Sequence, residues 1–445
     1  MIETLFIANR GEIALRVIRT AKRLGIETVL GVSEADGRSA AAWLADRIAP
    51  VGPAPSAQSY LSVDNVVKAA RDSGADALHP GYGFLAENVG LARACAEAGI
   101  VFVGPDPASL EAMGDKLMAR TVGIAAGLPV VPGGEAADKD AARARAEETG
   151  YPLLLKAVSG GGGKGMKRVD DPAQLDAQID MAMREAQAAF GDPRVYVERF
   201  IASGRHVEVQ ILGDGESAIH LGTRDCSIQR RFQKLVEEAP APALPDDKRA
   251  AIEDAAVRLA KHLDYRGAGT VEFLVDSETF DFFFLEMNAR IQVEHPVTEA
   301  ITGIDLIEQQ LLVAGGSPLA LTQDMVRPFG HAIEVRINAE DWRKDFQPSP
   351  GIASSVRWPA GPGIRVDTHI FDGGEVPPFY DSLAGKLIVH GKDRDEAVAK
   401  LVAALGDFAL EGMETTAGLH IAIAADPRFK AGGVDTRFFG EFAHG

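Results

Sequence analysis

The sequence predicts an α/β protein that begins with a doubly wound parallel sheet and continues into a small α+β lobe and a C-terminal mixed β/α region. Short apolar runs alternate with helical patterns between residues 4 and 103, as is typical of a parallel sheet. Residues 151–212 indicate hairpins around a glycine run. Residues 331–391 indicate short strands that Pro and Gly interrupt.

The composition fits a folded protein of several domains. At roughly 100–200 residues per domain, the 445 residues suggest about two to four domains. The hydrophobic fraction of 46% excludes extensive disorder. No apolar run reaches the ~18 residues of a membrane span, and the N-terminus lacks a secretory signal pattern. The two cysteines, Cys95 and Cys226, exclude a disulfide framework, so we expect a cytoplasmic protein.

The net charge of −18 also limits the partners of the chain. An excess of acidic residues argues against binding to nucleic acid or to an anionic membrane, so we expect neither partner. The same charge argues against a polyanionic ligand, unless basic side chains gather locally.

The N-terminal elements follow the apolar runs in order. Residues 4–8 predict a buried strand, and a helical pattern runs from Ile13 to Leu24, where Gly25 ends it. Further elements are expected as strands at 28–32, 77–79 and 100–103, and as helices at 63–73 and 88–98.

The middle and C-terminal elements follow a different pattern. Residues 114–130 predict a helix and a Gly/Pro turn, and the charged residues 138–148 predict a solvated helix. Strands are then expected at 153–156, 195–198, 206–211, 271–274 and 280–287, the last two joined by a turn at 276–279. Helices are expected at 173–189, 248–262, 304–313 and 394–410.

Four consecutive glycines, 160–163, precede Lys164. Each glycine inside a helix or strand costs about 0.5–1 kcal/mol relative to alanine, so such a run needs another reason. Backbone N–H groups without neighbouring Cβ atoms can converge on phosphate oxygens, and Lys156 and Lys164 supply positive charge. The alternative is a flexible surface loop, which the apolar strand that ends in Lys156 makes less favourable.

Two common phosphate-binding motifs do not fit the chain. A Walker A loop needs Ser or Thr after its lysine, and Gly165 stands there. The first strand leads into a segment with one glycine, Gly11, whereas the dinucleotide fingerprint needs three. Nicotinamide chemistry is therefore not expected.

Carboxylate and amide side chains interrupt two apolar strands. Glu286 and Asn288 are two residues apart and share one face of a strand, and Glu272 joins them if the two strands pair. Three hard oxygen ligands beside a phosphate loop suit Mg²⁺. The alternative is that these are exposed positions of half-solvated strands.

An arginine and a glutamate follow, at positions 290 and 294, and they share one face if the chain stays extended. Arg290 is suited to holding a small anion while Glu294 takes a proton. His295 has no Cys/His cluster in the sequence around it, so zinc ligation is not expected.

At this point the chain resembles the biotin carboxylase family of the ATP-grasp superfamily over essentially its whole length. The resemblance rests on ordered motifs at Phe6–Ala14, His79–Asn88, Met113–Lys116, the glycine run, Arg224–Arg231, Glu286–Glu299 and Arg336–Asp341. It implies three domains: a doubly wound domain at 1–113, an ATP-grasp region at 114–328 with a glycine-rich flap lobe near 131–203, and a C-terminal domain at 329–445.

The resemblance implies ATP- and bicarbonate-dependent carboxylation of biotin held on a carrier. The nucleotide would contact Lys116, Lys156, Gly162, Gly163, Glu198, Arg199, Phe200, Ile201 and His206. Mg²⁺ (or Mn²⁺) would be bound by Glu272, Glu286 and Asn288, of which the two glutamates also contact ATP. Bicarbonate would be held by Lys234, Arg290 and the Val293 backbone. Glu294 would be the base, and Arg336 would stabilise the deprotonated biotin oxygen.

The partners that the resemblance implies are a biotin carboxyl carrier protein or domain, a carboxyltransferase component and a second copy of the chain. The sequence around Lys386 and Lys116 does not match a biotin-attachment site, so the biotin must arrive on another chain or segment. The final acyl acceptor is not specified, although Lys156–Ser159 slightly favours the acyl-CoA carboxylases.

The chain departs from the family pattern at Phe232, and also at Ala86 and Ala289, where the family has serine and threonine. Phe232 stands where the family has histidine or asparagine near the ribose, and we expect it to stack or to pack. Two alternatives remain: another ATP-grasp ligase that joins a carboxylate to an amine, or a regulatory protein with an inactive site. The first should not need the run from Arg290 to Glu294 with Arg336, and the second should have lost part of it.

Overall fold

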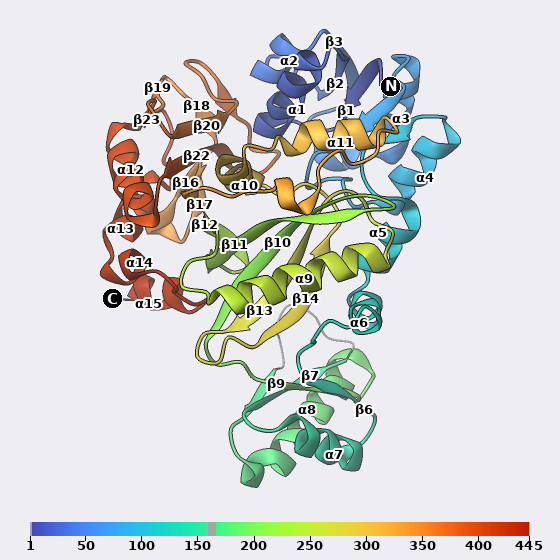
Figure 1. Cartoon of the computed structure of the whole chain (residues 1–445), viewed down its shortest axis with the longest axis vertical. Coiled ribbons are helices and arrows are strands. Elements are labelled where there is room, and N and C mark those ends of the chain that lie inside the picture. The colour runs from blue at the N-terminus through green and yellow to red at the C-terminus, as the bar shows by residue number, and fades with distance from the viewer. Residues whose placement is uncertain (1, 159–165, 445) are drawn as a thin grey trace. The chain divides into compact units, whose positions relative to one another are not determined.

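The computed structural model describes residues 2–158 and 166–444, which Figure 1 shows with their elements labelled. These residues divide into two compact units. Unit 1 comprises Met1–Leu128, Arg205–Leu274 and Leu285–Gly445, and unit 2 comprises Pro129–Gly204 and Val275–Phe284. The three-domain division remains a prediction.

The expected parallel sheet opens unit 1. Its strands have the order β3-β2-β1-β4-β5, and all neighbours are parallel. Helix α1 packs against α11, because the apolar faces of the two helices share one core. Figure 1 shows these helices side by side. The elements are β1 Thr4–Ile7, α1 Gly11–Arg23, β2 Glu27–Ser33, α2 Ala40–Leu44, β3 Arg47–Gly52, α3 Val63–Asp72, β4 Ala77–His79, α4 Val89–Glu97 and β5 Val101–Phe102.

An eight-stranded sheet forms the centre of the fold, in the order β14-β13-β10-β11-β12-β15-β22-β20. The pairs from β10 to β20 are antiparallel. Its strands are β10 Gly204–Asp214, β11 Ala218–Arg230, β12 Gln233–Ala239, β13 Arg266–Asp276, β14 Phe282–Asn288, β15 His331–Asn338, β20 Ile364–Thr368 and β22 Leu383–Gly391. This order places β10 beside β13 and β12 beside β15, which positions the candidate site.

Helices and short strands surround the large sheet. Helix α10 packs against β11, β12, β15 and β22, and α12 packs against β15 and β22. The helices are α9 Asp246–His262, α10 His295–Thr302, α11 Leu306–Ala314, α12 Arg394–Asp407, α13 Ala417–Ala425, α14 Pro427–Ala431 and α15 Phe438–His444. The short strands are β16 Glu340–Asp341, β17 Gln347–Pro348, β18 Gly351–Ile352, β19 Ser355–Arg357, β21 Glu375–Val376 and β23 Ala409–Glu411.

Unit 2 is a four-stranded sheet, in the order β6-β9-β7-β8, with two helices. Leu153, Leu155, Val195 and Val197 are fully buried together, which gives the unit a core of its own. The elements are β6 Gly133–Ala136, α7 Lys139–Thr149, β7 Leu153–Ala157, β8 Lys167–Val169, α8 Pro172–Phe190 and β9 Val195–Arg199.

The helix and the Gly/Pro turn predicted at 114–130 are present, since α6 ends at Ala125 before Gly127 and Pro129, but the helix before them was not predicted. The structure has α5 Pro107–Gly114 and α6 Lys116–Ala125, separated by Asp115 in an extended conformation. Asp106 caps α5 and Pro107 occupies its first turn, a combination that marks a helix start.

One strand prediction also differs from the structure, and the edge strand at residues 47–52 had no prediction. The strand predicted to start at Phe280 begins at Phe282, because Phe280 takes a positive φ of 57° in the turn. Strand β3 was not predicted, because Pro50 interrupts its pattern; proline is tolerated there since β3 is an edge strand.

Both cysteines are buried and free, as expected. None of the helices in the described residues combines the length and the apolar character that a membrane crossing needs.

Leu155→Ala should lower the free energy of unfolding of unit 2 by about 2–5 kcal/mol, because it removes a fully buried side chain from the core of that unit. Urea denaturation would measure the change in free energy of unfolding, and hydrogen exchange of the β7 and β9 amides would assign it to unit 2. The control is Met181→Ala, at an exposed position of α8, for which we expect a change within about 0.5 kcal/mol. Equal effects of the two substitutions would contradict the prediction.

Candidate active site

Lys234, on β12, lies at the centre of a buried ionic cluster. Its ammonium nitrogen lies 2.6 Å from Glu294 Oε1, 2.7 Å from Glu208 Oε2 and 3.1 Å from Glu272 Oε1. Burial alone would lower the pKa of Lys234, but the carboxylates of Glu208 and Glu294 raise it well above its usual range. Lys234 is therefore a cation at neutral pH.

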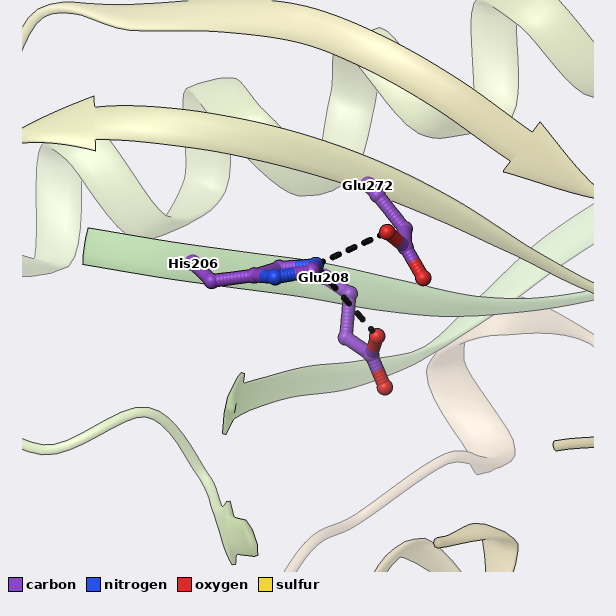
Figure 2. Close-up of side chains that lie close together, drawn as sticks. All are labelled: His206, Glu208 and Glu272. Carbon is purple, nitrogen blue, oxygen red and sulfur yellow. Dashed lines mark ion pairs between the residues drawn. The ribbon is translucent and has the colours of Figure 1, made fainter. Parts of the chain in front are cut away.

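Two neighbouring strands supply the carboxylates on one side of this cluster. On β10, His206 and Glu208 alternate with valines and share one face of the strand. Figure 2 shows the end of the His206 ring between the carboxylates of Glu208 and of Glu272, which lies on β13, the next strand in the sheet. His206 Nε2 lies 2.8 Å from Glu272 and 4.0 Å from Glu208 Oε2. The alternative of half-solvated strands is therefore wrong for Glu272, which is buried.

Arg224 binds the Glu208 oxygen that Lys234 does not contact. Its fully buried guanidinium donates to Glu208 Oε1 at 2.5 Å, to Gln210 Oε1 at 2.7 Å, to Thr270 at 2.9 Å and to Thr298 at 3.0 Å. Because the donors of the guanidinium have fixed directions, these bonds fix the position of the Glu208 carboxylate.

Glu294 is the residue that precedes α10, and it is fully buried. Its Oε1 accepts from Lys234, and its Oε2 accepts from Arg336 at 3.0 Å. Burial alone would raise the pKa of Glu294, but the charges of Lys234 and Arg336 hold it well below its usual range. Glu294 is therefore an ionised carboxylate between two cations.

Arg336, on β15, also contacts Glu237 of the neighbouring strand. The Nε atom donates to Glu237 Oε1 at 2.7 Å. Burial raises the pKa of Glu237 to about 7, although Arg336 lowers it. Arg336 thus joins β12, β15 and the loop before α10.

Arg290 belongs to the same network through Asn288. Its guanidinium donates to Asn288 Oδ1 at 2.9 Å and to Glu87 at 3.0 Å, and the Asn288 amide donates to Glu272 at 2.8 Å. The predicted pairing of the strands that carry Glu272 and Glu286 is confirmed, since β13 and β14 are neighbours.

The donor set predicted for Mg²⁺ is compatible with that ion. The carboxylate of Glu272 lies beside the amide of Asn288, and Glu286 shares the strand face of Asn288. Hard oxygen donors of this kind are those that Mg²⁺ prefers.

Two further groups of side chains could offer ligands to a metal ion, because the ligand atoms within each group lie within 4.8 Å of one another. The groups are His206, Glu208 and Glu272, and Glu208, Cys226 and Glu294. The ammonium of Lys234 already occupies the space among the carboxylates of both groups and offsets part of their charge. We assign no metal to either group.

A cavity of about 380 Å³ opens beside the cluster within unit 1. Lys234, Arg336 and Val293 line it, together with Glu12 and Tyr82 from the N-terminal region. The structure therefore places the Val293 backbone and the cations Lys234 and Arg336 at one cavity. Glu294, the predicted base, lies next to them.

The Tyr82 loop is held by Asn9. The Asn9 amide donates to the carbonyls of Pro80 and Tyr82, both at 2.7 Å. Gly81 has a φ of 64°, and a Cβ atom there would lie 2.8 Å from the Asn9 amide nitrogen. Only glycine fits this turn, so the loop and the end of β1 fit together through these two residues.

The predicted nucleotide residues of unit 2 lie on or after its strands. Lys156 on β7 pairs with Glu198 on β9, next to Arg199. Phe200 stacks under the guanidinium of Arg168, and Ile201 follows it. Gly162 and Gly163 lie outside the described residues, as does the Lys116 side chain, although its backbone begins α6.

Several residues of the cluster were not predicted. Glu208, Glu237 and Glu87 belong to it because they pair with Lys234, Arg336 and Arg290. A signal for Glu208 exists in the sequence, since it is an acidic residue between two valines of a strand. The expectation that Phe232 packs within the chain was wrong: it is 91% exposed, with a φ of 67° at the β11–β12 turn.

Comparisons with known proteins identify the family. Residues 1–110 match the model of the biotin carboxylase N-terminal domain, 115–322 the ATP-binding domain of the carbamoyl-phosphate synthase L chain, and 334–441 the biotin carboxylase C-terminal domain. Biotin carboxylase 1 of Bacillus subtilis (strain 168) is 48% identical over 98% of each chain. Biotin carboxylase of Nostoc sp. is also 48% identical, over 99% of each chain.

Solved structures agree with this result. The biotin carboxylase domain of a thermophilic 2-oxoglutarate carboxylase, solved with ADP, is similar at a TM-score of 0.94 and 44% identity, over 100% of this chain and 99% of the other. A biotin carboxylase complex with a β,γ-ATP ligand from Campylobacter jejuni gives 0.89 and 44%, over 99% of each chain. Together with the cluster around Lys234 and Glu294, these similarities show that the chain belongs to the biotin carboxylase family of ATP-dependent ligases.

Proposed function

We propose that this chain carboxylates biotin on a carrier protein, with ATP and bicarbonate, through carboxyphosphate. The observation that carries the proposal is the buried Glu294 carboxylate between Lys234 and Arg336, at a cavity that Val293 also lines. This arrangement offers a proton acceptor and two cations to one small anion.

In the first step, Glu294 takes the proton of bicarbonate while Lys234, Arg290 and the Val293 backbone hold the anion. An oxygen of the resulting carbonate attacks the γ-phosphorus of ATP, the bond to the β-phosphate oxygen breaks, and ADP leaves. Because bicarbonate competes with Glu294 for the charge of Lys234, its binding should raise the proton affinity of Glu294. The free ion pair thus keeps the base ionised until substrate arrives.

Arg336 has a separate role toward biotin. The C–O bond of carboxyphosphate breaks to give CO2 and phosphate, and this phosphate takes the ureido proton. The negative charge that loss of the proton places on the ureido oxygen is stabilised by a fixed guanidinium, and the ureido nitrogen then bonds the carbon of CO2. The bonds from Arg336 to Glu237 and Glu294 support the role, because they fix its orientation at the cavity.

The nucleotide residues complete the proposal. Lys116, Lys156, Gly162 and Gly163 would hold or cover the phosphates, and Glu198, Arg199, Phe200, Ile201 and His206 would contact the adenosine. Glu272, Glu286 and Asn288 would hold Mg²⁺ or Mn²⁺, which supplies positive charge to the phosphates. Exclusion of water by the glycine segment would protect carboxyphosphate from hydrolysis.

The finer assignments rest on the relatives. We propose that the chain works in the cytoplasm with a biotin carboxyl carrier and a carboxyltransferase, and that it serves an acyl-CoA carboxylase of fatty acid metabolism. Components of a pyruvate carboxylase and of a 2-oxoglutarate carboxylase are also similar to it, so purification with its partners is the experiment that identifies the acceptor. The matched segments support three domains, at 1–113, 114–328 and 329–445.

The wild-type chain should release phosphate from ATP and Mg²⁺ at a rate that rises with free biotin when bicarbonate is present. A coupled phosphate assay would measure this, with bicarbonate-depleted buffer as the control. A folded chain with no biotin stimulation would rule out the function.

Glu294→Gln should lower kcat about 10²–10⁴-fold, because the amide cannot accept the bicarbonate proton, while ATP affinity changes little. Phosphate release and equilibrium ATP binding would be measured together. Glu253→Gln, a glutamate on α9 that is absent from the cavity lining, is the matched control and should keep wild-type turnover. Substantial turnover in Glu294→Gln would refute the role of base.

The chain should also form a homodimer, as one related biotin carboxylase domain does. Sedimentation velocity at micromolar concentration should give the mass of two chains. A single species at 47.2 kDa would contradict this expectation.

A further inference from the structure

Lys386 is a buried lysine that no part of the proposed reaction uses. It lies on β22, directly opposite Arg336 of β15, and its side chain is 0% exposed. Burial of an ammonium group is costly unless it is paired and hydrogen-bonded. The contacts of the Lys386 ammonium explain why a lysine is buried at this position.

The ammonium of Lys386 joins two parts of the cavity wall. It donates to the Val293 carbonyl at 2.8 Å and lies 3.0 Å from Glu12 Oε1. The Tyr82 hydroxyl donates to the same Glu12 oxygen. Val293, Glu12 and Tyr82 all line the cavity, whereas Lys386 itself does not.

The Val293 carbonyl lies at a point where the backbone changes direction. Val293 lies in a turn between the end of β14 at Asn288 and α10, and it precedes Glu294, the residue before α10. A bond to this carbonyl orients the peptide plane that joins Val293 to Glu294. Lys386 thereby fixes the backbone between the two residues proposed to hold and deprotonate bicarbonate.

The carboxylates around Lys386 keep its ammonium group protonated. Burial alone would lower its pKa, but the carboxylates of Glu12, Glu334 and Asp367 raise it. The lysine therefore donates to Val293 as a cation at neutral pH, and such a charged donor gives a stronger bond than a neutral one.

We propose that Lys386 is a positioning residue for bicarbonate and biotin: it fixes the Val293–Glu294 backbone and, through Glu12, the Tyr82 hydroxyl. This inference rests on the proposed function, because it assigns the cavity to those two substrates. It does not involve the nucleotide residues, which gives it a distinct kinetic signature.

The test compares Michaelis constants for the three substrates. Lys386→Met should raise KM for bicarbonate and biotin about 10-fold or more, since small displacements of a site are costly, while KM for ATP stays within about twofold. A double variant, Lys386→Met with Glu12→Gln, avoids a buried unpaired carboxylate and should show the same split. Lys386→Arg, which keeps the charge, should recover part of the loss.

The matched control is Lys400 on α12. It also donates to a backbone carbonyl, that of His390 at 2.8 Å, and pairs with Glu396 at 2.7 Å, away from the cavity lining. Lys400→Met should leave all three KM values within about twofold, because it removes the same type of contact elsewhere.

Three outcomes would overturn the proposal: unchanged bicarbonate and biotin KM values in folded variants, a parallel change in all three KM values, or failure of both methionine variants to fold. The last would show that Lys386 serves stability of the whole fold. Hydrogen exchange of residues 289–297 should accelerate in the double variant but not in the control. This measurement needs no turnover, so it separates failure of the inference from a wild-type chain that does not respond to biotin.

Discussion

The contact on which the site depends is the ammonium of Lys234 among the carboxylates of Glu208, Glu272 and Glu294. Each carboxylate comes from a different segment, so the cluster ties β10, β12, β13 and the loop before α10 together. Removal of the cation would take one counter-charge from each of three buried carboxylates, which is far more costly than the loss of a surface pair. The pairing of the strands in the large sheet therefore depends on the same ionic contacts that form the site.

The electrostatics of the site differ from what the sequence suggested. Its net charge of −18 made a local excess of cations the expected way to hold an anion. In the described residues, three predicted site cations gather and each is paired: Lys234 with three carboxylates, Arg336 with Glu237 and Glu294, and Arg290 with Glu87. A substrate anion must compete with these partners, which favours anions small enough to enter the existing network. The retained pairing of Glu294 and Arg336 does not fit the loss of residues that an inactive regulatory site would show.

The sequence predicted those parts of the fold and site that depend on local pattern. Alternating strands and helices gave the parallel sheet, and the spacing of Glu286 and Asn288 gave their shared face. What it missed depends on distant partners: Pro50 is tolerated in β3 only because that strand is an edge, and Glu237 belongs to the site only because β12 pairs with β15. Helix α5 was also missed, although Asp106 and Pro107 mark its start in the sequence.

The two-segment construction of unit 2 has a consequence for modular exchange. Residues 129–204 are completed by 275–284, the tip of the β13–β14 hairpin, through bonds from Ser277 N to the Ser203 carbonyl and from Phe284 N to the Pro129 carbonyl. A cassette cut only at 128 and 205 would leave these backbone donors unsatisfied and the buried Phe284 without its cover. Recombination among relatives can therefore transplant this lobe intact only when the hairpin tip travels with it.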